Sequence, residues 1–343
     1  MTIAKKGLPN IKRKSASFSQ EDLVKTGLLP DGGNLPFVVT PAVEGVDLIA
    51  WVSNNRDFLQ QALYKHGGVL FRGFNLSEIG SFEQFTKAAS QELLEYKERS
   101  SPRSQVSGNI YTSTDYPSHQ HIFFHNENSY QHAWPMKLFF YCVTPAQQGG
   151  ETPIADVRKV YQRIDPSIRA EFAAKDVMYV RNFSQELGLP WETVFQTTDK
   201  AQVEAYCADH GIQVEWRDGN RLRTRVIRPA LAKHPVTGED LWFNHGAFFH
   251  VSTLEASIRD ALLSQFAEED LPSNTYYGDG STIAPEYLQA IRDAYHAEAR
   301  IFPWEQHDVI MLDNMLTAHA RTPYSGPRKI LVGMSEPLSR SAL

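Results

Sequence analysis

The sequence is poor in cysteine and contains no long apolar run. Only Cys142 and Cys207 are cysteines among 343 residues, too few for a disulfide framework or a zinc site made of cysteines. No stretch of about 18 apolar residues occurs, so no transmembrane helix and no membrane partner are expected. The first twenty residues lack the apolar segment of a secretory signal. We therefore expect a cytoplasmic protein.

The sequence also lacks an excess of positive charge, internal repeats and low-complexity tracts. Its net charge of −6 gives no reason to expect nucleic acid as a partner. Apolar content of 42% and charged content of 22% are ordinary for a globular protein. Residues 1–20 are rich in lysine and serine and predict a loosely ordered N-terminal arm.

The hydrophobic pattern predicts many short strands with helices beside them. Apolar residues at helical spacing predict helices over 48–65 and 156–173, and a buried strand over 69–74 follows the first of them. Further strands are expected at 137–143, 178–183, 221–227, 308–313 and 328–334. This order favours a β-sandwich or barrel with helical insertions. Residues 95–120 are polar and irregular, which inside a compact domain is typical of a binding loop or of disorder.

A histidine and a carboxylate stand two residues apart in the run Ile122-Phe123-Phe124-His125-Asn126-Glu127-Asn128. Along an extended strand, residues i and i+2 point to the same face, so His125 and Glu127 can converge on one point. One imidazole and one carboxylate are two thirds of a 2-His-1-carboxylate Fe(II) site, which leaves positions open for a cosubstrate and O2.

Among the twelve histidines, His319 is the best candidate for the third ligand. It follows an apolar strand and a turn, and Arg328 comes nine residues later at the start of the last apolar strand. A guanidinium can hold a carboxylate through two parallel hydrogen bonds. The sequence therefore offers both a metal site and a cation for the distal carboxylate of 2-oxoglutarate.

These motifs resemble those of the Fe(II)/2-oxoglutarate-dependent dioxygenases of the taurine dioxygenase (TauD/TfdA) superfamily, in the branch of clavaminate synthase and the SyrP-type amino-acid hydroxylases. The resemblance extends from about Gly67 to Pro337. It implies a mainly β fold with flanking helices, namely a double-stranded β-helix or jelly roll with helical insertions. Residues 21–343 would then form one dioxygenase domain, with an insertion or lid region at about 165–300.

The resemblance also implies roles for individual residues. His125, Glu127 and His319 match the iron ligands, Thr152 matches a residue whose hydroxyl meets 2-oxoglutarate, and Arg328 matches the arginine that pairs with its carboxylate. Arg321 is the alternative for this pairing, or a contact to substrate. Family members that halogenate lack the carboxylate ligand, so Glu127 favours hydroxylation.

The implied function is hydroxylation of an unactivated C–H bond in specialised metabolism, with Fe(II), 2-oxoglutarate and O2. The substrate would be an amino acid or a derivative, either free or tethered to a peptidyl carrier protein. Desaturation, cyclisation and C–C cleavage stay open with the same cofactors. Two other classes also stay open: a zinc hydrolase, since two histidines and a glutamate suit zinc, and a non-enzymatic jelly-roll binding protein.

Several other residues carry competing interpretations. His119 and His121 could compete as ligands, although polar loop residues are the simpler interpretation. His245 and His250 lie either near the pocket or in a packed aromatic segment. The arginine stripe, defined as Arg221, Arg223, Arg225 and Arg228, suits a phosphate or an acidic partner, although a solvated strand face is the favoured interpretation.

Overall fold

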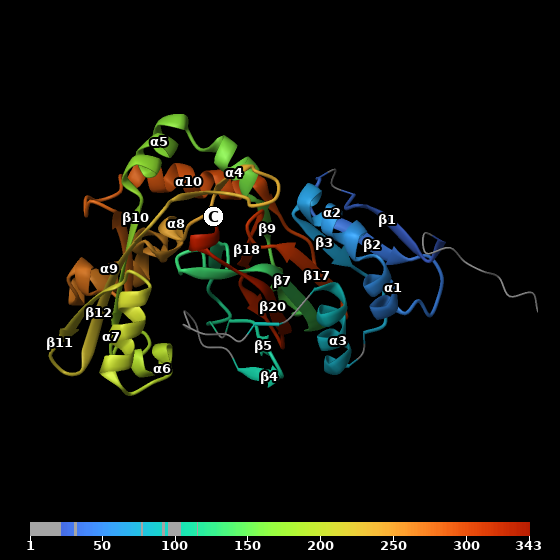
Figure 1. The fold of residues 1–343 in the computed structure, drawn as a ribbon, viewed down its shortest axis with the longest axis horizontal. Coiled ribbons are helices and arrows are strands. Elements are labelled where there is room, and N and C mark those ends of the chain that lie inside the picture. The colour runs from blue at the N-terminus through green and yellow to red at the C-terminus, as the bar shows by residue number, and fades with distance from the viewer. Residues whose placement is uncertain (1–21, 31–32, 77, 91–92, 95–103, 115) are drawn as a thin grey trace, which may run out of the picture.

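The computed structural model describes residues 22–30, 33–76, 78–90, 93–94, 104–114 and 116–343 (Figure 1). The predicted N-terminal arm lies outside these residues. The described helices are α1 (Leu48–Asn54), α2 (Arg56–His66), α3 (Ile79–Ala89), α4 (Val157–Arg163), α5 (Pro166–Lys175), α6 (Trp191–Phe195), α7 (Lys200–Asp209), α8 (Gly246–Phe249), α9 (Ala256–Gln265) and α10 (Pro285–Glu298). In the described part of the chain, no helix is long and apolar enough to cross a membrane.

Two facing sheets form the centre of the molecule. The larger has the order β1-β2-β3-β17-β7-β20-β5-β4 and the smaller has the order β16-β9-β18-β6. The larger sheet comprises β1 (Val24–Leu28), β2 (Phe37–Pro41), β3 (Gly68–Phe71), β17 (Val309–Asp313), β7 (Ala133–Thr144), β20 (Lys329–Ser339), β5 (Ile110–Thr112) and β4 (Gln105–Ser107). The smaller comprises β16 (Ala299–Arg300), β9 (Ile154–Asp156), β18 (Thr317–Arg321) and β6 (Ile122–His125).

Strand β7 is buried on both faces and its side chains alternate between two cores. Leu138 and Phe140 pack with Ile154 of the smaller sheet, so this core fills the space between the two sheets. Phe139 and Tyr141 point the other way, toward helices α1–α3. The continuous apolar run at 137–143 is thus explained by its burial on both sides.

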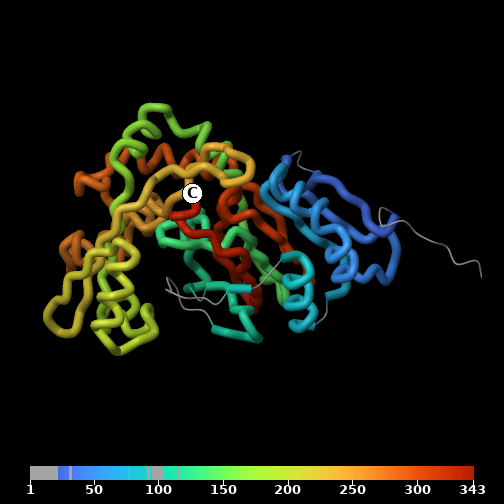
Figure 2. The backbone as a smooth tube through the Cα atoms, in the orientation of Figure 1, coloured from blue at the N-terminus to red at the C-terminus, as the bar shows by residue number. Residues whose placement is uncertain are grey.

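Helices α1, α2 and α3 cover the outer face of the larger sheet, as the blue and cyan part of Figure 2 shows. The single helix predicted over 48–65 is wrong, because the helical pattern is interrupted at Asn55. Its backbone leaves the helical region and its side-chain amide donates to the carbonyl of Trp51 at 2.7 Å. The helix predicted over 156–173 is likewise divided, since Pro166 begins a new helix, α5.

A second sheet system lies at the opposite end of the molecule from α1–α3 (Figure 2). Its strand order is β11-β12-β10-β15, with β10 (Val177–Phe183), β11 (Gln213–Arg217), β12 (Arg221–Arg228) and β15 (Ser273–Tyr277). Strand β12 carries the arginine stripe. Its Arg223 is buried and paired with Asp270, so the predicted solvated face is wrong at this position.

The remaining strands form two small ribbons. Strand β13 (Leu231–Lys233) pairs with β14 (Asp240–Trp242), and β8 (Gln148–Gly149) pairs with β19 (Tyr324–Ser325). The hairpin of β13 and β14 leads directly into α8 and the 3-10 helix η2 (Val251–Thr253). These last two elements form part of the wall of the cavity described next.

Candidate metal centre and substrate cavity

Three side chains converge where strands β6 and β18 pair. His125 ends β6, His319 lies directly opposite it in β18, and Glu127 follows two residues after His125. Their ligand atoms all lie within 4.8 Å of one another. The distance from His319 Nε2 to Glu127 Oε2 is 3.9 Å. The structure therefore brings together the three residues that the sequence offered as metal ligands.

The alternation of side chains along β18 directs His319 toward this point. Ala318 and Ala320 pack into the apolar cluster formed with the helices α4 and α10. His319 consequently faces the space between the two sheets, where its ring lies 5.0 Å from that of Phe140. Alanines on one face and a histidine on the other fit a strand shared by two cores.

The ring of His125 is held by a hydrogen bond and by a stacked ring. Its Nδ1 lies 2.8 Å from the carbonyl oxygen of Phe123 and must donate to it, which leaves Nε2 as the acceptor for a metal. Phe248 of α8 stacks on the imidazole at 4.8 Å with an interplanar angle of 11°. Such a fixed tautomer and ring plane favour metal binding.

Glu127 reaches the site by a different route from the predicted one. Strand β6 ends at His125, so the same-face rule for an extended strand does not apply to Glu127. Its backbone is held instead by Asn314, whose Oδ1 accepts from the Glu127 N–H at 2.7 Å. The amide nitrogen of Asn314 donates to the Glu127 carbonyl at 2.9 Å. Asn128 follows with a φ of 59°, which turns the chain away.

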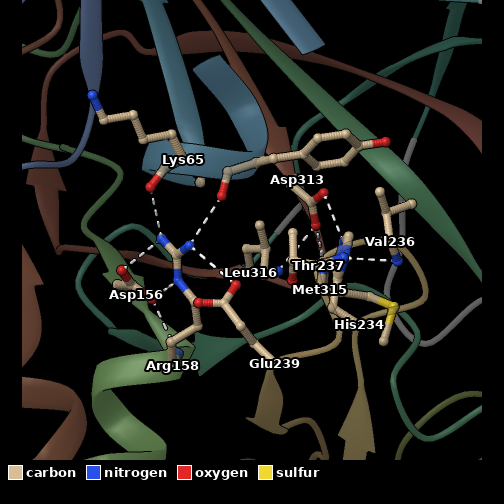
Figure 3. A network of polar contacts seen from close by, with 12 residues as sticks. Lys65, Asp156, Arg158, His234, Val236, Thr237, Glu239, Asp313, Met315 and Leu316 are labelled. Atoms are coloured by element: carbon tan, nitrogen blue, oxygen red, sulfur yellow. Dashed lines mark hydrogen bonds and ion pairs between the residues drawn. The ribbon is translucent and has the colours of Figure 1, made fainter. Parts of the chain in front are cut away.

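The turn that carries Asn314 is itself held by a buried carboxylate, shown in Figure 3. Asp313 Oδ1 accepts the backbone N–H groups of Met315 and Leu316 at 2.9 and 3.0 Å. Its Oδ2 lies 3.1 Å from Nε2 of buried His234. Because His234 Nδ1 accepts from the N–H of Thr237 at 3.1 Å, its Nε2 donates to Asp313.

A second pair in the same view fixes the end of β9 (Figure 3). Arg158 donates to both carboxylate oxygens of Asp156, at 2.8 and 2.9 Å, and to the carbonyls of Tyr64 and Lys65. Its Nη1 also lies 3.4 Å from Glu239, in the same turn as His234. These contacts join α2, β9 and the β13–β14 turn.

A small inner pocket lies beside the two histidines and contains the residues predicted for 2-oxoglutarate. It is lined by His125, His319, Thr152 and Arg328, among others. The hydroxyl of Thr152 accepts a hydrogen bond from the indole of Trp304 at 3.1 Å. A hydroxyl so held can still donate its own proton to a ligand.

Arg328 lines this inner pocket, where its guanidinium could bind an anion. Its Nε donates to the carbonyl of Gly150 at 2.8 Å, and Nη1 lies 3.3 Å from Ser113 Oγ. Burial, together with the charge of nearby Arg321, lowers its pKa to about 10. Within the described part of the chain, Arg328 forms no ion pair with a carboxylate. A half-buried cation of this kind suits an anionic ligand.

Arg321 is used differently. Its guanidinium donates to the backbone carbonyls of Tyr116, Pro117 and Gln120 at 2.6 to 3.0 Å. It therefore holds the loop that precedes β6. Arg321 also lines both pockets, but its Nη1 and Nη2 groups already donate to backbone carbonyls.

A cavity of about 820 Å³ opens on the other side of His125 and Glu127. Its wall is largely apolar and is built from the loop before β6, α8, η2, α9 and α10. The lining residues include Phe123, Phe248, Phe249, Leu254, Ile258 and Leu262, with Arg292 as a cation on α10. Sequence reasoning missed Phe248 and Arg292 because nothing local in the sequence marks either side chain as facing a pocket.

Three other candidate histidines can be placed relative to the cavity. His121 lines the cavity, whereas His119 is exposed and does not. His245 is buried beside the cavity and Ser129 Oγ lies 2.6 Å from its Nδ1. Burial lowers the pKa of His245 well below the usual value. None of these three joins the cluster of His125, Glu127 and His319.

The donor set fits a divalent transition metal. Two imidazoles and one carboxylate from neighbouring strands and one turn supply three ligands on one side. His125 lines both the inner pocket and the large cavity, so the remaining coordination positions would face both spaces. This facial arrangement with open positions is typical of non-heme Fe(II) oxygenases.

Comparisons with known proteins agree with this geometry. The family described as taurine catabolism dioxygenase TauD, TfdA matches residues 33–335. The dapdiamide synthesis protein DdaC of Enterobacter agglomerans is 39% identical over 284 residues, covering 83% of this chain and 86% of that protein. A clavaminate synthase-like protein of Arabidopsis thaliana is 27% identical, covering 82% of this chain and 86% of its own length.

Solved structures share the fold at low sequence identity. PvcB of Pseudomonas aeruginosa superimposes with a TM-score of 0.55 and 15% identity, covering 94% of both chains. A second PvcB structure, described as an Fe, alpha-ketoglutarate dependent oxygenase from an isonitrile synthetic pathway, gives a TM-score of 0.53, with 15% identity and 94% coverage of both chains. AAD-2, solved with Mn(II) and N-oxalylglycine, gives 0.51 with 15% identity and covers 91% of this chain and 96% of its own. The predicted mainly β jelly roll with flanking helices is thereby confirmed.

Proposed function

The chain belongs to the taurine catabolism dioxygenase TauD/TfdA family and is an Fe(II)- and 2-oxoglutarate-dependent dioxygenase, and we propose that it hydroxylates an unactivated C–H bond of an amino acid or amino-acid derivative. The family decides against the zinc hydrolase and the non-enzymatic binding protein that the sequence alone left open. The observation that carries the proposal is the convergence of His125, Glu127 and His319 between two pockets.

In this proposal His125, Glu127 and His319 hold the iron. The support is their mutual distance, within 4.8 Å, and the hydrogen bond that fixes the His125 tautomer. Asn314 acts as a positioning residue because it holds the backbone of Glu127 on both sides. When bound, Fe(II) and 2-oxoglutarate supply the oxidative decarboxylation of the cosubstrate and the transfer of oxygen to the substrate.

The inner pocket would take 2-oxoglutarate. Arg328 would pair with its distal carboxylate and the Thr152 hydroxyl would donate a hydrogen bond to it, which would fix the orientation of the cosubstrate. The support is that Arg328 is half-buried, has no ion-pair partner among described residues and shares the pocket with both histidines. Phe140 and Phe248 border the histidines and would keep water from the reacting atoms.

The large cavity would take the substrate. A role in specialised metabolism is supported by the similarity to DdaC, which is named for dapdiamide synthesis, and by the structural likeness to PvcB of an isonitrile pathway. The substrate would be free or tethered to a peptidyl carrier protein. Desaturation, cyclisation or C–C cleavage remains the alternative outcome, because the outcome depends on which C–H bond of the substrate lies nearest the iron.

We also propose that residues of about 165–300 form an insertion or lid within a single domain spanning 21–343. The support is that α8, η2, α9 and α10 together supply one wall of the cavity. The same region carries a sheet of its own, with the order β11-β12-β10-β15. Closing this wall on a substrate would remove water from the site.

The test is His319→Ala, compared with exposed His119→Ala as a matched control. We expect the His319 variant to fold, to lose Fe(II) binding and to form no succinate from 2-oxoglutarate, while the control behaves as wild type. Decarboxylation retained at wild-type rate in His319→Ala with added Fe(II) would contradict the ligand assignment. Wild-type protein that binds zinc but consumes no O2 with 2-oxoglutarate would contradict the function itself.

A further inference from the structure

We propose that Arg292 binds an oxyanion of the substrate, and that the substrate carries no free ammonium group. This rests on the function proposed above and narrows its substrate class. The oxyanion would be the carboxylate of a free N-acylated amino acid or the phosphate of a carrier protein's pantetheine arm. Both sources share the chemistry of an anionic oxygen on an otherwise uncharged body.

Arg292 lies in the wall of the cavity and not beside the metal ligands. Its Nη1 lies 3.1 Å from Ser252 Oγ and 3.4 Å from Thr253 Oγ1, both in η2. Its Nε and Nη2 lie 3.4 and 3.2 Å from Gln289 Oε1 on the same helix. All of these acceptors are neutral, and Ser252 and Thr253 line the cavity as well.

Arg292 has no carboxylate partner among the described residues, a property that it shares with Arg328 but not with several other arginines of similar burial. Arg72 pairs with Asp308, Arg158 with Asp156, and Arg223 with Asp270. In the described part of the chain, Arg292 forms no ion pair. A half-buried guanidinium in an apolar wall is costly unless a ligand completes its pairing. Placed polar groups in an apolar cavity commonly set the orientation of the ligand.

The described residues that line the cavity offer an ammonium group no carboxylate other than that of Glu127. Glu127 is the only acidic residue among the described residues that line it, and Glu127 is assigned to the metal. A zwitterionic amino acid would therefore bring a cation to a wall that already contains Arg292 and Arg321. Acylation removes that charge and leaves an amide, which costs far less to bury.

The size of the cavity and the position of Arg292 agree with an acylated substrate. Its volume of about 820 Å³ lies in the upper part of the range for drug-sized ligands, roughly 300–1,000 Å³. Helix α10 contacts the metal-bearing strand through Tyr295, whose ring stacks on Phe124 at 5.6 Å. Arg292 lies three residues earlier, about one helical turn or ~5 Å along the axis. An anion there leaves room for a body that extends toward the metal.

The experiment compares matched probes on wild type, Arg292→Gln and Arg259→Gln. Arg259 is an arginine of α9 that pairs with Asp260 and does not line the cavity. The probes are N-acetyl-L-amino acids with apolar side chains, their carboxamides, the free amino acids, and N-acetyl-aminoacyl thioesters of pantetheine with and without the 4′-phosphate. Binding is followed by the change each probe causes in the visible charge-transfer band of the anaerobic enzyme with Fe(II) and 2-oxoglutarate, and turnover is followed by succinate.

We expect wild type to bind N-acetyl acids, or phosphorylated thioesters, roughly 10- to 100-fold more tightly than their uncharged counterparts. Arg292→Gln should lose this preference while its thermal unfolding and charge-transfer band stay unchanged, and Arg259→Gln should keep it. Preference for the acid over the carboxamide identifies a carboxylate, and preference for the phosphorylated thioester identifies a carrier arm.

Three results would overturn the inference. One is free amino acids binding as tightly as their N-acetyl forms. Another is an equal loss of charged and uncharged probes in Arg292→Gln, which would show a purely structural anchor between α10 and η2. The third is no binding of any charged probe to an enzyme that shows the charge-transfer band. Absence of that band in wild type would instead overturn the proposed function.

Discussion

Asn314 holds the backbone of Glu127 on both sides, accepting from its N–H at 2.7 Å and donating to its carbonyl at 2.9 Å. The two residues are 187 positions apart in the chain. The same amide nitrogen also donates to the carbonyl of Pro135 at 2.8 Å. One buried side chain thus joins the turn after β17, the turn after β6 and the start of β7.

Asn314→Ala should therefore weaken both the fold and the metal site. It leaves buried backbone groups without partners, which costs roughly 2–4 kcal/mol of unfolding free energy. Loss of a group that orients a ligand commonly lowers metal affinity about 10- to 100-fold. Urea unfolding and Fe(II) titration measure the two effects, with exposed Asn54→Ala as the control. Unchanged Fe(II) affinity in Asn314→Ala would show that Glu127 is held by other contacts.

Arg158→Met should separate stability from metal binding. It removes both hydrogen bonds to Asp156 and those to the carbonyls of Tyr64 and Lys65. Breaking a buried pair by removing one partner should cost about 3 kcal/mol of unfolding free energy. The Fe(II) affinity of the folded variant should match wild type, because none of these groups contacts a proposed ligand. A large loss of affinity would show that β9 positions the site.

Arg328→Ala and Arg321→Ala should have different kinetic effects. Loss of Arg328 should raise the KM for 2-oxoglutarate roughly 10- to 100-fold, because a charge-assisted pair is removed. Loss of Arg321 should disturb the 116–120 loop and raise the KM for the substrate more than that for 2-oxoglutarate. Succinate formation at varied cosubstrate concentration measures the first effect. The reverse pattern would assign the cosubstrate carboxylate to Arg321.

His250 should make stability depend on pH. Its pKa is lowered to about 4, chiefly by burial, with an opposing effect of Glu268 and a smaller lowering effect of Arg292. An exposed histidine has a pKa of about 6.5. Between these values the unfolded chain binds a proton that the folded protein does not, so stability falls as the pH falls. Relative to His250→Asn, wild type should lose on the order of 2 kcal/mol between pH 7 and pH 4.5.

Urea unfolding at several pH values measures this difference, and asparagine keeps an acceptor for the Ser252 N–H that His250 Nδ1 now receives at 3.1 Å. Exposed His119→Asn should show the same pH dependence as wild type. Parallel curves for wild type and His250→Asn would mean that His250 is protonated in the folded protein at low pH.

The sequence predicted the strands of the centre well because both of their faces are buried. The apolar runs at 137–143 and 308–313 became β7 and β17, which lie side by side in the larger sheet. Helix boundaries were less accurate, because Asn55 and Pro166 interrupt helices whose apolar spacing continues across the break. Apolar spacing alone does not register such a capping residue.

Site residues were predicted correctly where their immediate sequence neighbours indicate their position, and less well where distant contacts determine it. His125 and His319 stand beside apolar strands, and the structure pairs them directly. The prediction for Glu127 assumed that residues i and i+2 of one strand share a face. Glu127 lies beyond the end of the strand, and Asn314 of a distant turn orients it instead. Arg292 was not predictable, because its relevance depends on how α10 packs against η2.

The proposed metal ligands and most of the cavity wall come from different parts of the chain. His125, Glu127 and His319 belong to β6, the turn after it and β18, whereas the facing wall is made by α8, η2, α9 and α10. Under the proposed function, substitutions in the 246–298 segment, Phe248 beside His125 excepted, would change which substrates bind while leaving the metal ligands in place. Among such enzymes, sequence differences would be concentrated in this wall. The helices would then differ according to the substrate, while the strands that carry the metal ligands would stay similar.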